Sequence, residues 1–251
     1  MFHYTYRAEA YLDPWSEPPE GVEPPPEGVR GPRRILYREA GVWRIAEVRA
    51  RSYYKLAPTS PGAAPTLEID GIHMHRVSGT DPLRDAAAKV RAARVSRGHR
   101  VLDVCTGLGY TAAASLARGA ALVHTVEVDE HVLWLAERNP WSRPLGDPRV
   151  AILLGDALEV LAELPGAHYD RAIHDPPRFT SRTSHLYSLD LYREIYRLLR
   201  PGGVLFHYTG EPGRLRRLSL PGRVSRLLRE AGFEDVRWVE AAKGLRARKP
   251  P

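Results

Sequence analysis

One segment constrains the fold of this chain more than any other, the run VLDVCTGLGYT from Val101 to Thr111. Its first half is apolar enough for a buried strand, and glycines follow at positions 107 and 109 before a helix-forming run. Glycine at such a junction lets the backbone approach a ligand closely, and the helix start offers amide hydrogens to an anion. The segment therefore predicts a ligand-binding loop at the carboxyl end of a strand.

The sequence after Gly98 alternates short apolar strands with helical segments, which is typical of a doubly wound α/β fold with a mostly parallel sheet. Asp81 and Pro82 predict the N-cap and first turn of a helix that begins a domain over 81–251. The expected strands are 100–105, 121–128, 149–154, 170–174, 203–209 and 235–240. Further helices are expected near 109–119, 130–139, 157–164, 185–200 and 220–231.

The sequence before residue 81 has a different character. Residues 1–34 are rich in proline, which prevents regular helix or central strand and predicts a tail or wrapping arm. In residues 35–80, alternating runs flank Gly41 and then the dipeptide Asp70-Gly71, which favours tight hairpin turns. These patterns predict a small antiparallel β module, called here the N-terminal module (residues 35–80).

Composition excludes several classes of protein. Hydrophobic residues make up 43% and charged residues 27%, a globular balance that argues against disorder throughout. No apolar run approaches the roughly 18 residues that span a bilayer, and the first residues lack a secretory signal pattern, so we expect a cytoplasmic protein without membrane contact. Cys105 is the only cysteine, which rules out a disulfide within the chain and a cysteine-built metal site, and we expect no metal.

An acidic residue follows the glycine loop at the spacing of a nucleoside site. Glu127 lies at the end of the next expected strand, where a carboxylate can bind both hydroxyls of an adenosine ribose. The spacing of Gly107, Gly109 and Ala112 also satisfies the dinucleotide pattern. The loop alone therefore does not separate a nicotinamide cofactor from S-adenosylmethionine (AdoMet).

Two further acids favour AdoMet. Asp103 precedes the loop, where it would repel a pyrophosphate but could hold the cationic amino group of AdoMet. Asp156 follows the third strand and can accept a hydrogen bond from the adenine amino group. Each acid has a plain alternative, as a helix cap or a solvated loop residue. The predicted cofactor contacts are Asp103, Thr106, Gly107, Gly109, Glu127, Asp156 and Ala157.

The segment IHDPPRF follows the fourth expected strand and predicts a catalytic site. Two prolines fix an extended backbone that donates no hydrogen bonds, which leaves Asp175 and nearby carbonyl groups free to accept from a substrate amino group. Pro176 belongs to this wall, and Phe179 could stack on a planar substrate. His174 is a second candidate base, although a lone histidine at a strand end is more often structural. Asp-Pro-Pro is also an ordinary turn sequence.

These segments resemble the class I AdoMet-dependent methyltransferases, within them the spermidine-synthase-like branch of archaeal predicted methyltransferases. The likeness rests on DVCTGLGYTA, TVEVDEHVLWLAERNPWS, LLGDALEVL, IHDPPRF, LYREIYRLLRPGGVLFHYTGEPG and LEIDGIHMHRVSGTDPLRDAAAKV. It implies a seven-stranded sheet whose last strands are antiparallel, and an AdoMet-dependent methyltransferase with Asp175 as the catalytic-site acid. Two positions depart from the family: Cys105 stands where many members have a third glycine, and Arg178 separates Pro-Pro from the aromatic residue.

The resemblance leaves three functions open. The first is methylation of a nitrogen, with RNA as the favoured substrate. The second is aminopropyl transfer from decarboxylated AdoMet to a polyamine, which the Arg-rich flanks and the CTGLG loop disfavour. The third is a noncatalytic AdoMet-binding regulator.

The preference for RNA rests on charge. The formal net charge is +7, and nearly all basic residues are arginine, the side chain best suited to phosphate. A basic stretch after the fifth strand could contact RNA phosphates or could be the outer face of an ordinary amphipathic helix. Its candidate contacts are Arg214, Arg216, Arg217, Arg223 and Arg226. The sequence does not indicate an oligomeric state.

Overall fold

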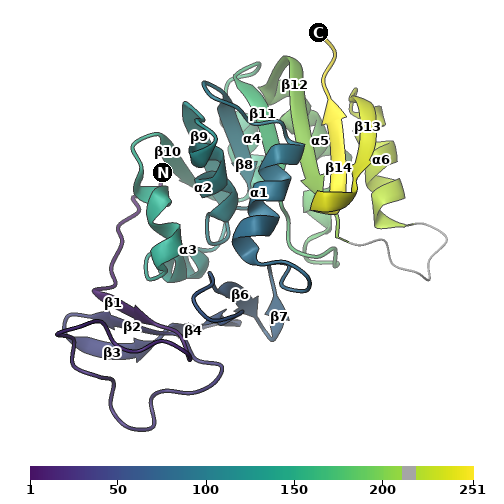
Figure 1. Cartoon of the computed structure of the whole chain (residues 1–251). Helices are drawn as coiled ribbons and strands as arrows, with labels where there is room; N and C mark the ends of the chain where they lie inside the picture. The colour runs from purple at the N-terminus through teal and green to yellow at the C-terminus, as the bar shows by residue number, and fades with distance from the viewer. Residues whose placement is uncertain (211–218) are drawn as a thin grey trace.

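A seven-stranded sheet forms the centre of the computed structural model, which describes residues 1–210 and 219–251. The strand order is β10-β9-β8-β11-β12-β14-β13 (Figure 1). The first five strands in this order run parallel, whereas β14 is antiparallel to both of its neighbours. The strands are β8 (Arg100–Val104), β9 (Leu122–Glu127), β10 (Val150–Leu154), β11 (Tyr169–His174), β12 (Leu199–Tyr208), β13 (Glu234–Val239) and β14 (Gly244–Arg248). The predicted fold class is confirmed.

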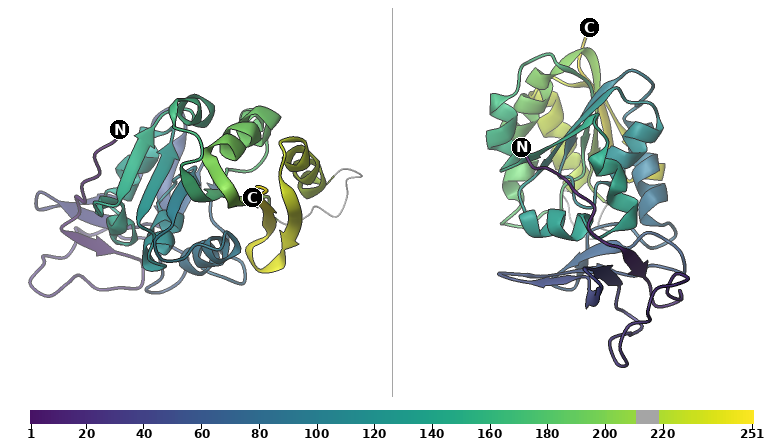
Figure 2. Two further views of the ribbon diagram at one scale, coloured as in Figure 1. Left: turned by 90° about the horizontal axis from the view of Figure 1, so that it is seen from above. Right: turned by 90° about the vertical axis from the view of Figure 1, so that its left-hand side faces the viewer.

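Helices cover both faces of the sheet (Figure 2). One apolar cluster packs α1, α2 and α3 on one face, and a second packs α4, α5 and α6 on the other. The helices are α1 (Pro82–Ala92), α2 (Tyr110–Ala117), α3 (Glu130–Ala136), α4 (Ala157–Glu163), α5 (Leu189–Leu198) and α6 (Leu220–Glu230). This double covering explains why the parallel strands read as apolar runs rather than alternating ones.

Several boundaries differ from the sequence expectation. Helix α1 begins as predicted, because Asp81 accepts hydrogen bonds from the amides of Leu83 and Arg84. The helix expected over 185–200 is instead a 3-10 turn at Ser184–Tyr187 followed by α5. Strand β14 was not predicted from its sequence, and it pairs with β12 and β13 at the sheet's antiparallel edge.

The N-terminal module forms parts of two small antiparallel sheets rather than one. One has the order β1-β2-β3 and the other β4-β5-β6-β7. Both predicted hairpins are present, and their turns at Ala40-Gly41 and Asp70-Gly71 have positive φ at both central residues. The strands are β1 (Ala10–Leu12), β2 (Leu36–Glu39), β3 (Val42–Ile45), β4 (Glu47–Arg49), β5 (Tyr53–Ala57), β6 (Thr66–Ile69) and β7 (Ile72–His73).

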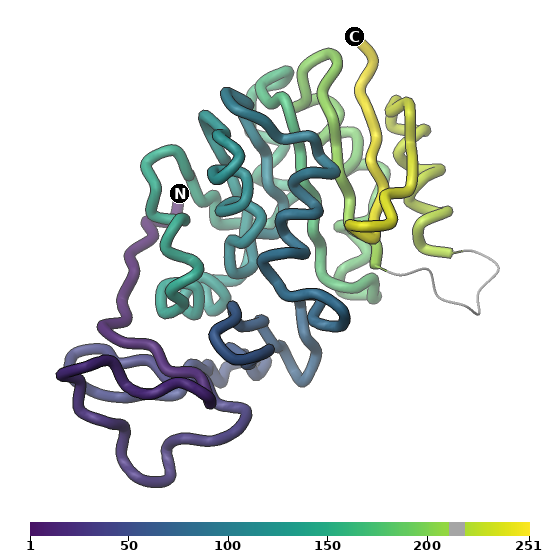
Figure 3. Tube along the Cα trace, viewed as in Figure 1, coloured from purple at the N-terminus to yellow at the C-terminus, as the bar shows by residue number. Residues whose placement is uncertain are grey.

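The first residues of the chain run from the edge of the central sheet to the small sheets (Figure 3). Phe2 pairs with Ile152 of β10, and the amide of Arg7 donates to the carbonyl of Glu137. Strand β1 then pairs with β2. The prediction of a proline-rich arm over residues 1–34 did not include β1. Within the described residues, no helix is long and apolar enough to cross a membrane.

Two histidines lie side by side in the middle of the sheet. His174 of β11 is in register with His207 of β12, both are fully buried, and their ring centroids are 4.4 Å apart. Burial lowers the pKa of His207 to about 3 and that of His174 well below its ordinary value. Tyr192 lies 2.9 Å from His207 Nε2. Both rings are therefore neutral in the folded protein.

This burial predicts a loss of stability in acid. His207 takes up a proton in the unfolded chain near its ordinary pKa but not in the folded protein, so folding weakens as pH falls through about 6.5. Between pH 7 and pH 5 the loss from this one residue is about 2 kcal/mol. Urea unfolding of the wild type and His207→Gln at both pH values measures it, with a smaller drop expected in the variant. Equal drops in both proteins would contradict the assignment.

Candidate active site

A cavity of about 300 Å³ opens where the carboxyl ends of the central strands face the small N-terminal sheets. The loops after β8, β9, β10 and β11 supply one side of it, and β6, the segment around His75 and the start of α1 supply the other. Open parallel sheets bind ligands at this end of their strands. Of the predicted site residues, Thr106, Gly107, Glu127, Asp156, Ala157, Asp175 and Pro176 line the cavity.

The glycine loop turns sharply between β8 and α2. Cys105, Gly107 and Gly109 all have positive φ, of 74°, 54° and 76°. A Cβ on Gly109 would lie 2.6 Å from the side chain of Leu145. Both this clash and the positive φ exclude a larger residue at the position. Gly109 caps α2 from behind the cavity wall and does not line it. Cys105 adopts the left-handed backbone despite its side chain, and burial raises the pKa of its thiol well above normal, which disfavours a nucleophilic role.

Glu127 joins this loop to the neighbouring strand. One carboxylate oxygen accepts from the amide of Gly107 at 2.9 Å, and the other accepts from Val128 and Asp129 at 2.9 and 3.1 Å. Burial raises the pKa of Glu127, against the opposing effect of these three amides. The side chain is 8% exposed and lines the cavity. A carboxylate held this way is placed to receive a pair of ribose hydroxyls.

The structure corrects the direct role predicted for Asp103. Its side chain is fully buried and does not line the cavity. Asp103 Oδ2 accepts from the hydroxyl of Thr125 at 2.8 Å, and that hydroxyl lies 2.6 Å from the hydroxyl of Thr106 in the loop. Burial raises the pKa of Asp103 to about 7. Asp103 is therefore connected to the loop from below, through two threonines, rather than exposed to a cofactor amino group.

Asp156 caps helix α4 and also lines the cavity. Its Oδ1 accepts from the amide of Leu158 at 2.9 Å, and its Oδ2 lies 3.4 Å from His185 Nε2. The capping bond leaves lone pairs on this carboxylate, so the cap is compatible with the predicted contact to the adenine amino group.

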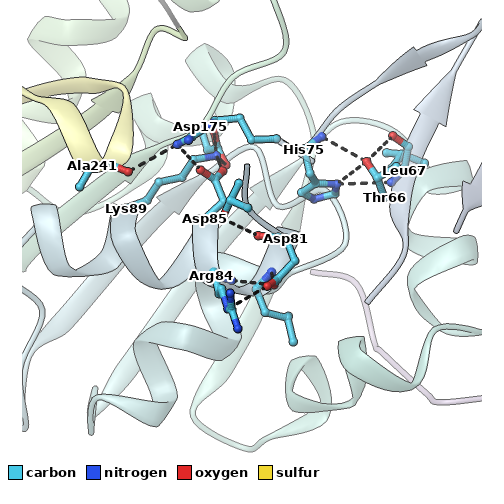
Figure 4. Close-up of polar contacts among 12 residues, drawn as sticks. Thr66, Leu67, His75, Asp81, Arg84, Asp85, Lys89, Asp175 and Ala241 are labelled. Atoms are coloured by element: carbon cyan, nitrogen blue, oxygen red, sulfur yellow. Dashed lines mark hydrogen bonds and ion pairs between the residues drawn. The ribbon is translucent and has the colours of Figure 1, made fainter. Parts of the chain in front are cut away.

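Asp175 is paired with a lysine that the sequence analysis missed. Lys89 Nζ on α1 lies 2.8 Å from Asp175 Oδ1 and 2.6 Å from Oδ2, and 2.8 Å from Asp85 Oδ2 (Figure 4). Burial alone would lower the pKa of Lys89, but Asp175 and Asp85 raise it above its ordinary value. Burial raises the pKa of Asp175, with Lys89 opposing that shift. The available signal was a lysine four residues after an aspartate on an otherwise alanine-rich helix.

The other two predicted catalytic residues do not line the cavity. His174 is fully buried, and neither ring nitrogen has a hydrogen-bond partner among the described residues, so it is not available as a base. Phe179 is 39% exposed and packs edge-on against Tyr187, 5.3 Å between ring centroids. The guanidinium of Arg223 lies over its other side at 5.1 Å. Phe179 thus lies outside the cavity beside a basic helix.

His75 is a second cavity residue that the sequence analysis missed. The amide of Leu67 donates to His75 Nδ1 at 3.3 Å, so in the neutral ring the proton is on Nε2. Burial lowers the pKa of His75 to about 3, which keeps the ring neutral. The ring packs 5.0 Å from that of Tyr110. His75 is therefore a fixed hydrogen-bond donor in the cavity wall.

The donor set fits AdoMet. Glu127 and Asp156 contribute carboxylates to the cavity wall, the kind of acceptor that ribose hydroxyls and an adenine amino group bind, and the loop at Gly107 carries no Cβ to block close approach. The cavity therefore combines acceptors for the nucleoside end with an open backbone loop.

Comparisons with known proteins identify the family of this chain. A family model described as guanidinoacetate N-methyltransferase matches residues 66–211. An uncharacterized protein of Methanocaldococcus jannaschii is 46% identical over 206 residues, which cover 82% of this chain and 70% of that protein. The chain belongs to the class I AdoMet-dependent methyltransferase family. AdoMet is accordingly its cofactor.

The chain is also similar to aminopropyltransferases, in sequence and in fold. Polyamine aminopropyltransferase 2 of Streptomyces coelicolor is 34% identical over 142 residues, which are 54% of this chain but only 26% of that protein. Spermidine synthase from Thermotoga maritima aligns with a TM-score of 0.60 at 17% identity, covering 81% of this chain and 71% of that one. The fold is thus spermidine-synthase-like, as the resemblance implied.

The geometry of Glu127 predicts a measurable loss of cofactor affinity. Glu127→Gln replaces one acceptor oxygen by an NH₂ group, which must face either the Gly107 amide or the amides of Val128 and Asp129. We expect the Kd for AdoMet, measured by calorimetry, to rise at least tenfold, or about 1.4 kcal/mol. Asp190→Asn, on the exposed start of α5, is the matched control. Unchanged affinity in Glu127→Gln would argue against this carboxylate as a cofactor contact.

Proposed function

We propose that this protein transfers the methyl group of AdoMet to a nitrogen of an amino group, and that the acceptor is RNA. The observation that carries the proposal is that Asp175 and Pro176 lie on the same cavity wall as Gly107 and Glu127. A substrate amino group at Asp175 would therefore lie next to the cofactor. When bound, AdoMet supplies an electrophilic methyl group.

The segment around Asp175 is held rigidly. The amide of Asp175 donates to the carbonyl of Val104 at 3.1 Å, which ties the segment to β8. The hydroxyl of Tyr187 donates to the carbonyl of Pro177 at 2.7 Å. The carboxylate of Asp175 lines the cavity on this fixed segment and offers an acceptor to a substrate. A rigid acceptor orients a nitrogen lone pair for attack with little loss of entropy on reaction.

Lys89 and Asp175 can act together on the acceptor nitrogen, with Asp175 binding it and Lys89 stabilising the carboxylate. Each carboxylate oxygen has two lone pairs, so Asp175 can bind Lys89 and still accept from an N–H of the substrate. The ammonium of Lys89 opposes the effect of burial on Asp175 and favours the ionised form of its carboxylate. A charged acceptor favours departure of the proton from the nitrogen as it becomes methylated.

Two arginines at the cavity support an anionic acceptor. Arg182 lines the cavity, and Arg223 on α6 lies over the ring of Phe179. Of the residues predicted to contact RNA, Arg223 and Arg226 are exposed on α6. Arg214, Arg216 and Arg217 lie outside the described residues. Arg182 and Arg223 are suited to bind phosphates of a polynucleotide.

Aminopropyl transfer is the second candidate. The similarity to proteins named polyamine aminopropyltransferases favours it, and Asp85 with Asp175 forms a pair of carboxylates of the kind that cationic amines require. In this chain that pair already binds Lys89.

Label transfer tests the proposal. The protein is incubated with methyl-labelled AdoMet and separated pools of RNA, protein and small molecules. We expect label in RNA, and at least about 100-fold less with Asp175→Asn, because an oriented acceptor of this kind contributes 10²–10⁴-fold. AdoMet affinity in the variant should stay within about threefold of the wild type, and Asp190→Asn should label normally.

The other outcomes each decide against the proposal. Label only in protein or small molecules would exclude RNA. No methyl transfer, with product formed from decarboxylated AdoMet and putrescine, would establish aminopropyl transfer. AdoMet binding without turnover in either assay would favour a noncatalytic regulator.

A further inference from the structure

Lys89 has an unusual position for a lysine. Its side chain is 2% exposed, yet it borders the cavity and its ammonium lies between Asp85 and Asp175 (Figure 4). The face of the Tyr208 ring lies 4.1 Å from Nζ. Two carboxylates and an aromatic face are the groups that bind an alkylammonium ion in a protein. Here the ion that they bind belongs to the chain itself.

The charges of this cluster balance. Arg76 Nη1 lies 2.9 Å from Asp85 Oδ1, so two cations face two carboxylates. The raised pKa of Lys89 means that its ammonium stays charged at neutral pH. The cluster therefore offers no uncompensated negative charge to a further cation.

The remaining carboxylates in the described cavity wall are also engaged. Glu127 accepts from three backbone amides, and Asp156 accepts from Leu158 and faces His185. Asp129 accepts from the hydroxyl of Tyr54 at 2.6 Å and from the amide of His131. A cationic substrate would therefore find each of these carboxylates already bound by donors of the chain itself.

We propose that Lys89 determines substrate class by occupying the cation position of the acceptor site, so that the enzyme takes an uncharged amino group and excludes alkylammonium ions such as diamines. This deepens the proposed function, because the acceptor is assigned to the same cavity. A second ammonium beside Lys89 would meet a like charge in a poorly solvated place. An aromatic or amide-like amino group carries no such charge.

Binding of a diamine without cofactor tests the inference. Putrescine is titrated by calorimetry and thermal unfolding into the wild type and into Lys89→Ala, with 1,4-butanediol as the uncharged ligand of similar shape. We expect Lys89→Ala to bind putrescine at least tenfold more tightly than the wild type and to gain Tm with its concentration. The affinity for butanediol should be the same in the wild type and in Lys89→Ala.

Matched variants locate the effect. Lys89→Arg keeps a cation and should keep excluding the diamine. Lys55→Ala removes a lysine that is paired with Glu68 outside the cavity, and should not gain binding. Asp85→Asn added to Lys89→Ala should remove most of the gain. If Lys89→Ala does not fold, Lys89→Met, which fills the same volume without charge, takes its place and should still bind more tightly than Lys89→Arg.

Two results would overturn the inference. The first is that the wild type binds putrescine as tightly as the Lys89 variants do. The second is that Lys89→Ala and Lys89→Met fold but bind putrescine no more tightly than the wild type. The readout is independent of the proposed function. A gain of diamine binding in a protein that labels no RNA would leave this inference standing and refute RNA methylation.

Discussion

The left-handed backbone between β8 and α2 is the constraint on which the site depends. Three residues in this short stretch have positive φ, and Leu145 closes the space behind Gly109. The turn directs the Gly107 amide toward Glu127. This hydrogen bond fixes the loop after β8 against the end of β9. Cys105 shows how strongly the fold imposes this path, since a residue with a Cβ adopts φ near +74° there at a cost of about 1 kcal/mol. The position is one where glycine would carry no such cost.

Buried charge gives the site its second organising principle. Lys89, Asp85, Asp175 and Arg76 come from α1, from the loop after β11 and from the segment before α1. A buried ion group costs free energy unless each member has partners, and losing one partner is far more destabilising than the group is stabilising. These pairings therefore fix the position of α1 against β11 more than they add to stability. The same geometry decides which charge a substrate can bring into the cavity.

Local patterns in the sequence predicted much of the fold. The alternation of strands and helices, the turn at Asp70-Gly71 and the cap at Asp81 are short-range features, and each appears as predicted. Strands β1 and β14 escaped prediction. β1 has only three residues and pairs with the distant β2, and β14 lies between β13 and β12, a partner distant in sequence. Gly107, Glu127, Asp156 and Asp175 could be assigned to the cavity because strand ends of a parallel sheet meet at one edge.

The misassigned residues share a different cause. Asp103 lies on β8 and His174 on β11, and both are fully buried. How deeply each side chain is buried depends on neighbouring strands that are distant in sequence, so no local pattern predicts it. Lys89 and His75 lie on segments that read as ordinary helix and turn. Their place at the cavity follows from packing of α1 and of the residues before it onto the sheet.

The N-terminal module completes the site rather than flanking it. Tyr54 binds Asp129 next to Glu127, and the hydroxyl of Tyr110 donates to the carbonyl of Pro65 at 2.8 Å. His75 adds its fixed donor to the same cavity wall. The cofactor side of the cavity is therefore built by the sheet, whereas much of the facing wall comes from residues that precede β8. Because Lys89 lies on α1, the charge that the acceptor site admits can change by substitution on this helix while the glycine loop stays as it is.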